Sequence, residues 1–178
     1  MASSKKGCGI GCFTIVIIFI ILSIIGSFFG SDDNSNSGQK EEKIEYSIGQ
    51  TVKTEKIEFT VLSTDKQKSV SIDDSGYFQY TAEGNNIYYI IKVKIKNISK
   101  ESIDLDTSGF KLLNNDISYT PSMLFTDSAM NFDGINPGTE IERNLYFDIP
   151  EDADLSNATL EAGDNIFSDT GEIKIKLN

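Results

Sequence analysis

The sequence predicts an all-β sandwich that follows a single N-terminal transmembrane helix, and three observations carry this prediction. The 20 residues from Ile10 to Phe29 carry no charge, and about 20 apolar residues are enough to cross a bilayer as a helix. Beyond position 43, apolar and polar residues alternate with a period of two in several short segments, as they do in half-buried strands. Turn-forming residues separate these segments.

The uncharged run 10–29 has the features of an anchor that stays in the protein. At about 1.5 Å rise per residue it spans about 30 Å, the thickness of a bilayer core. A cleavable signal has an apolar region of only about 7 to 15 residues and then two small residues flanking one other residue. No pair of small neutral residues with that spacing occurs between Ser23 and Asp32. We therefore interpret residues 10–29 as an uncleaved signal-anchor helix.

The charges beside this run predict its orientation. Lys5 and Lys6 precede it, whereas two aspartates follow it, and basic residues near a span favour the cytoplasmic side. This predicts a single-pass protein of the cell membrane, with the short segment 1–9 in the cytoplasm and the C-terminal domain extracellular. Cys8 and Cys12 lie at the cytoplasmic edge, where they fit either S-acylation or a tight helix start.

A polar tether and one domain follow the anchor. Residues 30–43 contain Gly, Ser, Asn and charged residues, and such a composition cannot bury enough surface to fold. Residues 44–178 suit one compact domain. All 27 acidic residues but only 14 of the 16 basic residues lie beyond position 30, which gives this part a formal charge of −13. Such a surface disfavours nucleic acid as a partner.

The clearest strand pattern lies in "IYYIIKVKIKN", residues 87–97. Apolar residues occupy one face, and Lys92, Lys94 and Lys96 occupy the other. Because Tyr88 and Ile90 make the first half apolar on both faces, we expect a central strand whose early part is covered on both sides. The same alternation predicts strands within residues 57–61, 145–149 and 173–177.

Turn sequences divide these strands. Asn114-Asn115-Asp116 separates the apolar segments 110–113 and 117–119, which predicts a hairpin. Pro137-Gly138 fits the centre of a type II turn, and Pro150 ends the strand that precedes it. A short helical turn is expected in residues 151–165, so that six or seven strands make up the sandwich.

Five of these segments, taken in order, resemble a known family: "YSIGQTV", "IEFTVLS", "EGNNIYYIIKVKIKN", "FKLLNNDISYTP" and "INPGTEIERNLYFDIP". They are similar to the uncharacterised telokin-like extracellular domains of Gram-positive bacterial lipoproteins and membrane-anchored surface proteins. The resemblance covers roughly Tyr46 to Pro150. It implies an immunoglobulin-like β-sandwich of about seven strands, outside the cell, with no catalytic residues. This chain departs from many such proteins by using a membrane span in place of a lipid.

The residue types present argue against catalysis. The chain has no His, and both Cys residues lie at the membrane end, which excludes Ser-His-Asp and Cys-His catalysis and the usual zinc sites. No spacing of carboxylates indicates a pair set across a cleft, as a glycosidase requires. We predict a protein that is not an enzyme and that has no cofactor.

Two acidic segments invite comparison with calcium sites. Residues 104–115 begin Asp-x-Asp-x-Ser-Gly as an EF-hand loop does, but Asn115 replaces the bidentate Glu of position 12 and the flanks indicate strands. A polar turn is the better interpretation, and we assign no metal site. A looser site formed by Asp148, Glu151, Asp152 and Asp154 stays open as an alternative to a solvated acidic loop.

The candidate binding residues are tyrosines. "SGYFQY" holds Tyr77, Phe78 and Tyr80, and Tyr88 follows closely. Tyrosine is enriched at interface centres, although it is also an ordinary strand residue that packs in cores. We predict that at least one of Tyr77, Tyr80 and Tyr88 is exposed and contacts a partner.

Two function classes therefore remain. The first is a surface binding module that meets a protein or cell-wall partner, and the second is an accessory or sensor subunit that modulates another membrane protein through its span. The pairs Gly7/Gly11 and Gly26/Gly30 have the spacing that allows close helix contact in membranes.

Overall fold

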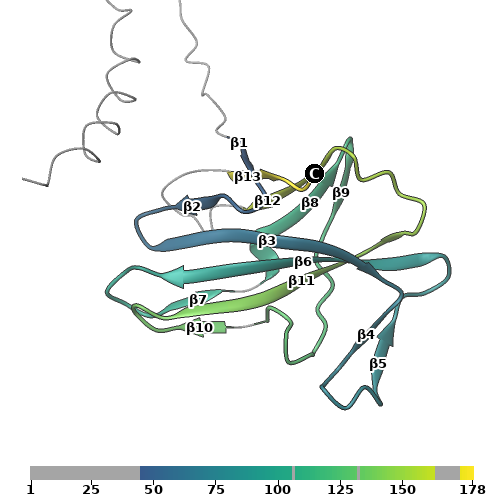
Figure 1. Ribbon diagram of the computed structural model, residues 1–178, viewed down its shortest axis with the longest axis horizontal. Helices are drawn as coiled ribbons and strands as arrows, with labels where there is room; N and C mark the ends of the chain where they lie inside the picture. The colour runs from purple at the N-terminus through teal and green to yellow at the C-terminus, as the bar shows by residue number, and fades with distance from the viewer. Residues whose placement is uncertain (1–44, 106, 132, 163–172) are drawn as a thin grey trace, which may run out of the picture. The chain divides into compact units, whose positions relative to one another are not determined.

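The computed structural model describes residues 45–105, 107–131, 133–162 and 173–178, and these residues form thirteen β-strands and one short 3-10 helix (Figure 1). The predicted anchor and tether lie outside the described residues. Within the described ranges, no helix is both long enough and apolar enough to cross a membrane.

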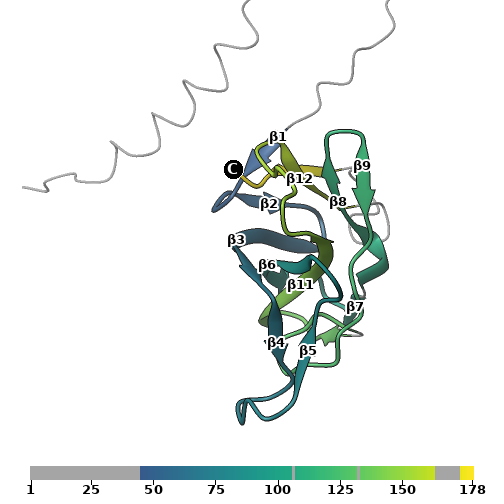
Figure 2. The same ribbon diagram turned by 90° about the vertical axis from the view of Figure 1, so that its right-hand side faces the viewer.

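The strands form an all-β sandwich of two main sheets, which confirms the predicted fold class at that level (Figure 1, Figure 2). One sheet has the order β11-β6-β3-β2, with β11 at Glu140–Pro150, β6 at Asn86–Asn97, β3 at Ile57–Gln67 and β2 at Thr51–Lys53. The other has the order β1-β13-β12-β8-β9, with β1 at Glu45–Ser47, β13 at Ile173–Lys176, β12 at Ala158–Ala162, β8 at Phe110–Asn114 and β9 at Ile117–Tyr119.

Two strand pairs complete the domain. β7 (Ile103–Leu105) pairs with β10 (Asp133–Ile135), and β4 (Ser69–Ser71) pairs with β5 (Gln79–Thr81). The 3-10 helix at Thr107–Gly109 leads into β8. Among the strand pairs of the described residues, only β1 with β13 is parallel. The strand count exceeds the predicted seven because many strands are only three residues long.

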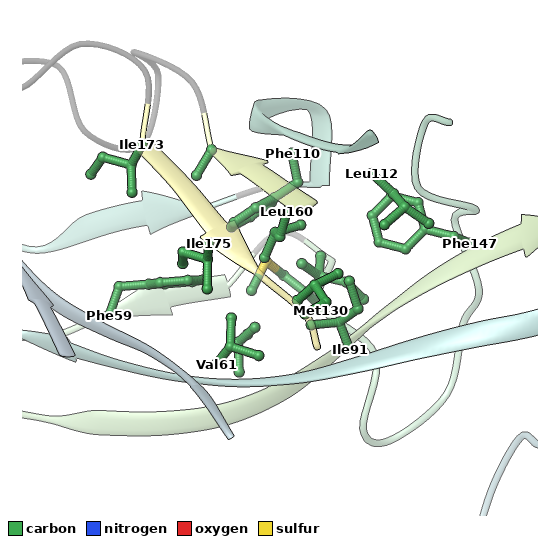
Figure 3. Close-up of a cluster of buried hydrophobic side chains, with 14 of the residues drawn as sticks. Phe59, Val61, Ile91, Phe110, Leu112, Met130, Phe147, Leu160, Ile173 and Ile175 are labelled. Atoms are coloured by element: carbon green, nitrogen blue, oxygen red, sulfur yellow. The ribbon is translucent and has the colours of Figure 1, made fainter. Parts of the chain in front are cut away.

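The main core lies between the two sheets, where apolar side chains from both sheets meet (Figure 3). The rings of Phe59 in β3 and Phe110 in β8 stack with centroids 5.8 Å apart. Figure 3 shows Val61 and Ile91 on the same side as Phe59, facing side chains of the opposite sheet. This is the arrangement that period-two alternation predicts, since one face of each strand is removed from water.

A second, smaller apolar layer covers the outer face of the β11-β6-β3-β2 sheet. It contains Tyr88 and Ile90 of β6, together with these residues from other elements: Val70, Ala82, Leu124, Ala129 and Tyr146. The early half of β6 is therefore buried on both faces, as predicted. In the later half, Lys92 pairs with Glu142 at 2.6 Å at the partly exposed outer face.

The turn predictions are confirmed. β8 and β9 form a hairpin closed by Asn115-Asp116, with Asn115 at φ 54°. Thr139 N donates to Asn136 O at 3.1 Å, and Gly138 has φ 76°, as the third position of a type II turn requires. β11 ends at Pro150.

The expected helical turn in residues 151–165 is wrong where the structure describes it. Residues 158–162 form β12, which lies between β8 and β13. Its sequence, Ala-Thr-Leu-Glu-Ala, contains good helix formers, but Ala158, Leu160 and Ala162 are buried on the sandwich face. Pairing with two neighbouring strands thus overrides a local helix preference, which is a weak determinant by comparison.

Candidate interaction face

Four large apolar side chains are exposed at one end of the domain. Tyr77 and Phe78 lie in the loop of the β4–β5 hairpin, with 88% and 69% of their surfaces exposed, and Phe125 is 61% exposed. Met123 is also exposed. The last two belong to the segment that joins β9 to β10, and this segment and the hairpin lie at the end of the domain opposite β1 (Figure 1, Figure 2). We call these four residues the apolar end.

Hydrogen bonds within the hairpin loop hold Tyr77 and Phe78 in place. Ile72 N donates to Phe78 O at 2.9 Å, closing the loop. Inside it, the Asp73 carboxylate accepts hydrogen bonds from the Ser75 hydroxyl and from Ser75 N. These hydrogen bonds lower the pKa of Asp73 below its ordinary value, so the carboxylate that organises the loop is ionised at neutral pH.

The segment after β9 is fastened to both the hairpin and the sheet. Asp127 N donates to Ile72 O at 3.2 Å, which joins the segment to the hairpin. Asn144 N in β11 donates to Ser128 O at 2.8 Å, and Ser122 N donates to Tyr146 O at 2.7 Å. Since Leu124 is buried in the outer apolar layer, its neighbours Met123 and Phe125 are directed to solvent.

An open groove of about 310 Å³ lies beside the apolar end, between the hairpin and this segment. Its lining residues are Gln67, Val70, Ser71, Ile72, Asp73, Asp74, Ile90, Asp127, Ser128, Asn144 and Tyr146. Three of them form a polar cluster. The Tyr146 hydroxyl is 3.0 Å from Ser128 Oγ, and Asn144 Nδ2 donates to both of these oxygens at 3.2 Å. The groove therefore combines apolar walls with oxygen atoms that can accept hydrogen bonds.

The groove is acidic. Asp73, Asp74 and Asp127 line it, and none of its lining residues is basic. The surrounding sequence has the same character, because residues 69–91 and 112–142 contain no Lys or Arg. No other described residue forms a hydrogen bond or ion pair with the carboxylates of Asp74 and Asp127. Their charges are therefore not compensated within this part of the protein.

The structure separates the three predicted tyrosines. Tyr77 is exposed, Tyr80 is half-buried against the outer apolar layer, and Tyr88 is buried with only 7% of its surface exposed. Tyr88 is therefore corrected from a candidate contact to a core residue. Burial, and after it the negative charge of Asp148, raises the pKa of its hydroxyl. The sequence already indicated this burial, because the first half of β6 is apolar on both faces.

Three of the four residues of the apolar end were not predicted as contacts from the sequence. Phe78 lies in "SGYFQY" between two predicted tyrosines, and Met123 and Phe125 lie in the segment that joins β9 to β10. Their segment has neither the alternation of a strand nor the periodicity of a helix, so only the apolar side chains after Pro121 marked it. The signal that could have found it is this set of apolar residues in a segment with turn-like composition.

The acidic segments that were compared with calcium sites do not form a metal site in the described part of the protein. Among the described residues, no three acidic side chains lie close enough together to hold a metal ion. Asp148 accepts a hydrogen bond from Asn86 Nδ2 at 2.7 Å, whereas Asp154 accepts one from Ser156 N at 3.0 Å. Around Asp104 the flanks are β7 and β8, as the sequence indicated, although residue 106 lies outside the described ranges.

A second open hollow, of about 470 Å³, lies at the turns that follow β2 and β6. It is lined by Glu55, Lys56, and residues 98–103. Its charges are of both signs, and its wall is held by the buried side chain of Asn97, whose Nδ2 donates to Glu101 O and Ile135 O at 2.7 and 2.8 Å. Asn97 is thus a structural residue, and this hollow offers no set of converging groups.

Comparison with known proteins gives a family and a fold. A family model described as "Domain of unknown function (DUF4352)" matches residues 46–175. No curated protein matches the chain. Solved structures with a similar fold include an uncharacterized β-sandwich protein from Clostridium difficile 630, with 23% identity, a TM-score of 0.57 and coverage of 80% of this chain and 100% of that chain.

Two further structures show the same fold. The yjhA protein from Bacillus subtilis has 23% identity and a TM-score of 0.58, covering 75% of this chain and 99% of that one. MPT63, a secreted protein from Mycobacterium tuberculosis, has 13% identity and a TM-score of 0.53, covering 76% of this chain and 98% of that one. At these identities the likeness concerns the sandwich and carries no activity across.

Proposed function

The chain belongs to the DUF4352 family of domains of unknown function, and we propose that it is a non-catalytic interaction module of the cell surface. The observation that carries this proposal is the apolar end, where Tyr77, Phe78 and Phe125 expose most of their surfaces on two segments fastened to each other. The DUF4352 domain would in this way be an immunoglobulin-like, telokin-like binding domain.

Exposed aromatic side chains in this arrangement favour binding. Large apolar side chains exposed together at one end of a soluble domain commonly mark a contact with a partner. Because the hairpin loop and the segment after β9 are already held by hydrogen bonds, little ordering is needed when a partner binds. Aromatic residues fixed in this way are typical of the few side chains that dominate binding energy.

The proposed location rests on the sequence. The uncharged run 10–29 and the basic residues before it support a membrane span with the sandwich outside the cell. Within the domain, β1 and the apolar end lie at opposite ends (Figure 1, Figure 2). A partner that binds the apolar end would therefore contact the domain at the end opposite β1.

The absence of catalysis is supported by the residue types in the domain. Residues 44–178 contain neither His nor Cys, so the common pairs of nucleophile and general base cannot form. In the groove, the Tyr146 hydroxyl is hydrogen-bonded with Ser128 and Asn144, and not with any of the three aspartates that line the groove. Binding is what this arrangement supports best.

The test is chemical crosslinking in intact cells with full-length protein as bait, followed by identification of captured partners. The double substitution Tyr77→Ser with Phe78→Ser should abolish capture of the specific partner. The matched control is Ile117→Ser, which removes an exposed apolar side chain from β9 without touching the apolar end. Equal capture by all three proteins would refute a role for this face.

The same experiment separates the alternative role, in which the protein modulates another membrane protein through its span. A version with residues 10–29 replaced by an unrelated span keeps a partner that binds the apolar end. Loss of the partner on this replacement alone would support the accessory or sensor subunit, for which the glycine spacings in the span are the observation in favour.

A further inference from the structure

We propose that the apolar end and its groove bind a basic, extended segment of a partner protein. In this arrangement a Lys or Arg side chain enters the groove near Asp74 and Asp127, and apolar side chains beside it cover Tyr77, Phe78 and Phe125. The inference rests on the proposed function, because it names the class of partner that this same face accepts.

The apolar part of the surface requires an apolar complement. Tyr77 and Phe78 protrude from the hairpin loop, and Phe125 protrudes from the adjoining segment. Removing such rings from water contributes roughly 25 cal/mol per Å² of apolar surface buried, so a partner gains affinity by covering them with apolar side chains. A highly hydrated, purely polar ligand could not do this.

The charge of the groove selects a cation. Asp74 and Asp127 lie in its lining on two different segments, brought together by the hydrogen bond from Asp127 N to Ile72 O. Their carboxylates have no partner among the described residues, and neither segment contains a basic residue. An entering ammonium or guanidinium group would therefore pair with exposed carboxylates without displacing an ion pair of the described residues.

The polar cluster in the groove fits the donors of such a group. The hydroxyl oxygens of Tyr146 and Ser128 can accept hydrogen bonds, and Arg and Lys side chains carry only donors. The exposed aromatic rings of the apolar end can add attraction for a cation over their faces. A long side chain with an apolar stem and a charged end thus suits a groove that has both apolar and polar lining atoms.

Other occupants fit less well. A membrane rich in anionic lipid and an anionic wall polymer would both be repelled by Asp73, Asp74 and Asp127. A second copy of the chain is disfavoured for the same reason, since the part beyond position 30 has a formal charge of −13. A basic segment of a protein is the class that satisfies the apolar and the acidic features together.

The test measures binding of labelled peptides to full-length protein in nanodiscs of zwitterionic lipid, by fluorescence anisotropy. The first probe alternates Lys with Leu and Val, the second has Glu in place of Lys, and the third has Ser in place of the apolar residues. The first should bind best, and its affinity should fall as salt rises from about 50 to about 300 mM, because exposed charges are screened.

The variants localise the binding. Asp74→Asn with Asp127→Asn should weaken binding of the first probe by about three- to tenfold, since two exposed ion pairs are lost. Tyr77→Ser with Phe78→Ser should weaken it by about tenfold or more. Asp116→Asn, in the β8–β9 turn, removes one negative charge elsewhere and should leave the affinity unchanged.

Each contrary result has a distinct meaning. Equal binding of the Lys and Glu probes, or no effect of the Asp74/Asp127 double variant, overturns the basic partner. Binding to phosphatidylglycerol vesicles that depends on Tyr77 and Phe78 also overturns it and assigns the face to a membrane. If cellular capture depends on Tyr77 and Phe78 but not on Asp74 and Asp127, the interaction module stands and only the partner class falls. If capture depends on neither pair, both proposals fall.

Discussion

The rings of Tyr88 in β6 and Tyr146 in β11 meet edge to face, with centroids 6.4 Å apart and planes at 82°. This pair lies at the centre of the outer apolar layer, beneath the hairpin and the segment that carry the apolar end. The layer thus supports the exposed face from beneath, and it explains why Tyr88 is a core residue whereas Tyr77 lies on the surface.

Truncation of a buried side chain in the outer apolar layer should lower the stability of the domain. Tyr88→Ala removes a buried ring and leaves a cavity, which should lower the free energy of unfolding of the domain 44–178 by about 2 to 4 kcal/mol. Tyr77→Ala removes an exposed ring and should change it by less than about 0.5 kcal/mol. Urea denaturation of both variants measures the difference, and equal losses would contradict the two positions given to these residues.

The buried Asn97 should be needed for stability. Its Nδ2 donates to the carbonyl oxygens of Glu101 and Ile135, and its Oδ1 accepts from Ser99 N at 2.9 Å. Asn97→Ala removes these buried hydrogen bonds and should lower the free energy of unfolding by about 2 to 4 kcal/mol, measured by urea denaturation. The matched control is Asn157→Ala. Asn157 is exposed and, like Asn97, is followed two residues later by a Ser or Thr, and its substitution should change stability little.

The carboxyl group of Glu142 should titrate below its ordinary range. A hydrogen bond from Lys92, and then the charge of Lys92, lowers the pKa of Glu142. Lys92→Met should raise that pKa toward the unperturbed value of about 4.3, while Lys111→Met should leave it unchanged. NMR titration of the carboxyl carbon measures both shifts.

The sign of the stability change follows from this shift. Because the pKa of Glu142 is lower in the folded state, the ion pair of Lys92 and Glu142 stabilises the protein at pH values above the unfolded pKa of Glu142. This contribution is lost as the pH falls through the folded pKa. Wild type and Lys92→Met should therefore converge in stability in acid. A gap that widened as pH fell would contradict the pairing.

The turn before β11 should depend on glycine. Gly138 has φ 76°, a conformation that a residue with a Cβ adopts only with strain. Gly138→Ala should therefore lower the free energy of unfolding by about 1 to 2 kcal/mol, although the space around a Cβ is open. Asn115→Gly, at φ 54° in the β8–β9 turn, is the opposite change and should be neutral or stabilising. Thermal melts of both variants measure these changes.

The parts of the fold that could be predicted are those that a repeating pattern determines. In β3, β6 and β11 one face must leave water, so alternation such as Phe59 and Val61 appears directly in the sequence. The Pro137-Gly138 turn was predictable for a similar reason, since its backbone geometry restricts the residues allowed. Strand alternation and turn composition are both properties of residues that are close together in the sequence.

The parts that could not be predicted depend on contacts between distant segments. β12 is a strand because β8 and β13 lie on either side of it, which its own five residues do not reveal. The candidate face forms because Asp127 meets Ile72, and no local pattern in either segment encodes that meeting. Tyr77 and Tyr88 were equivalent by residue type, and their burial separates them only in the folded domain.

The hairpin loop should be dispensable for folding but required for binding. Replacing residues 72–78 by Asn-Gly joins β4 to β5 through a short turn that suits a hairpin and keeps Val70 in the outer apolar layer. Stability should fall by only about 1 kcal/mol, because the main lost contact is the hydrogen bond from Asp127 N to Ile72 O. Partner capture should disappear. An unfolded variant, judged by circular dichroism, would instead show that the loop belongs to the core, and the Tyr77/Phe78 double variant would then decide binding alone.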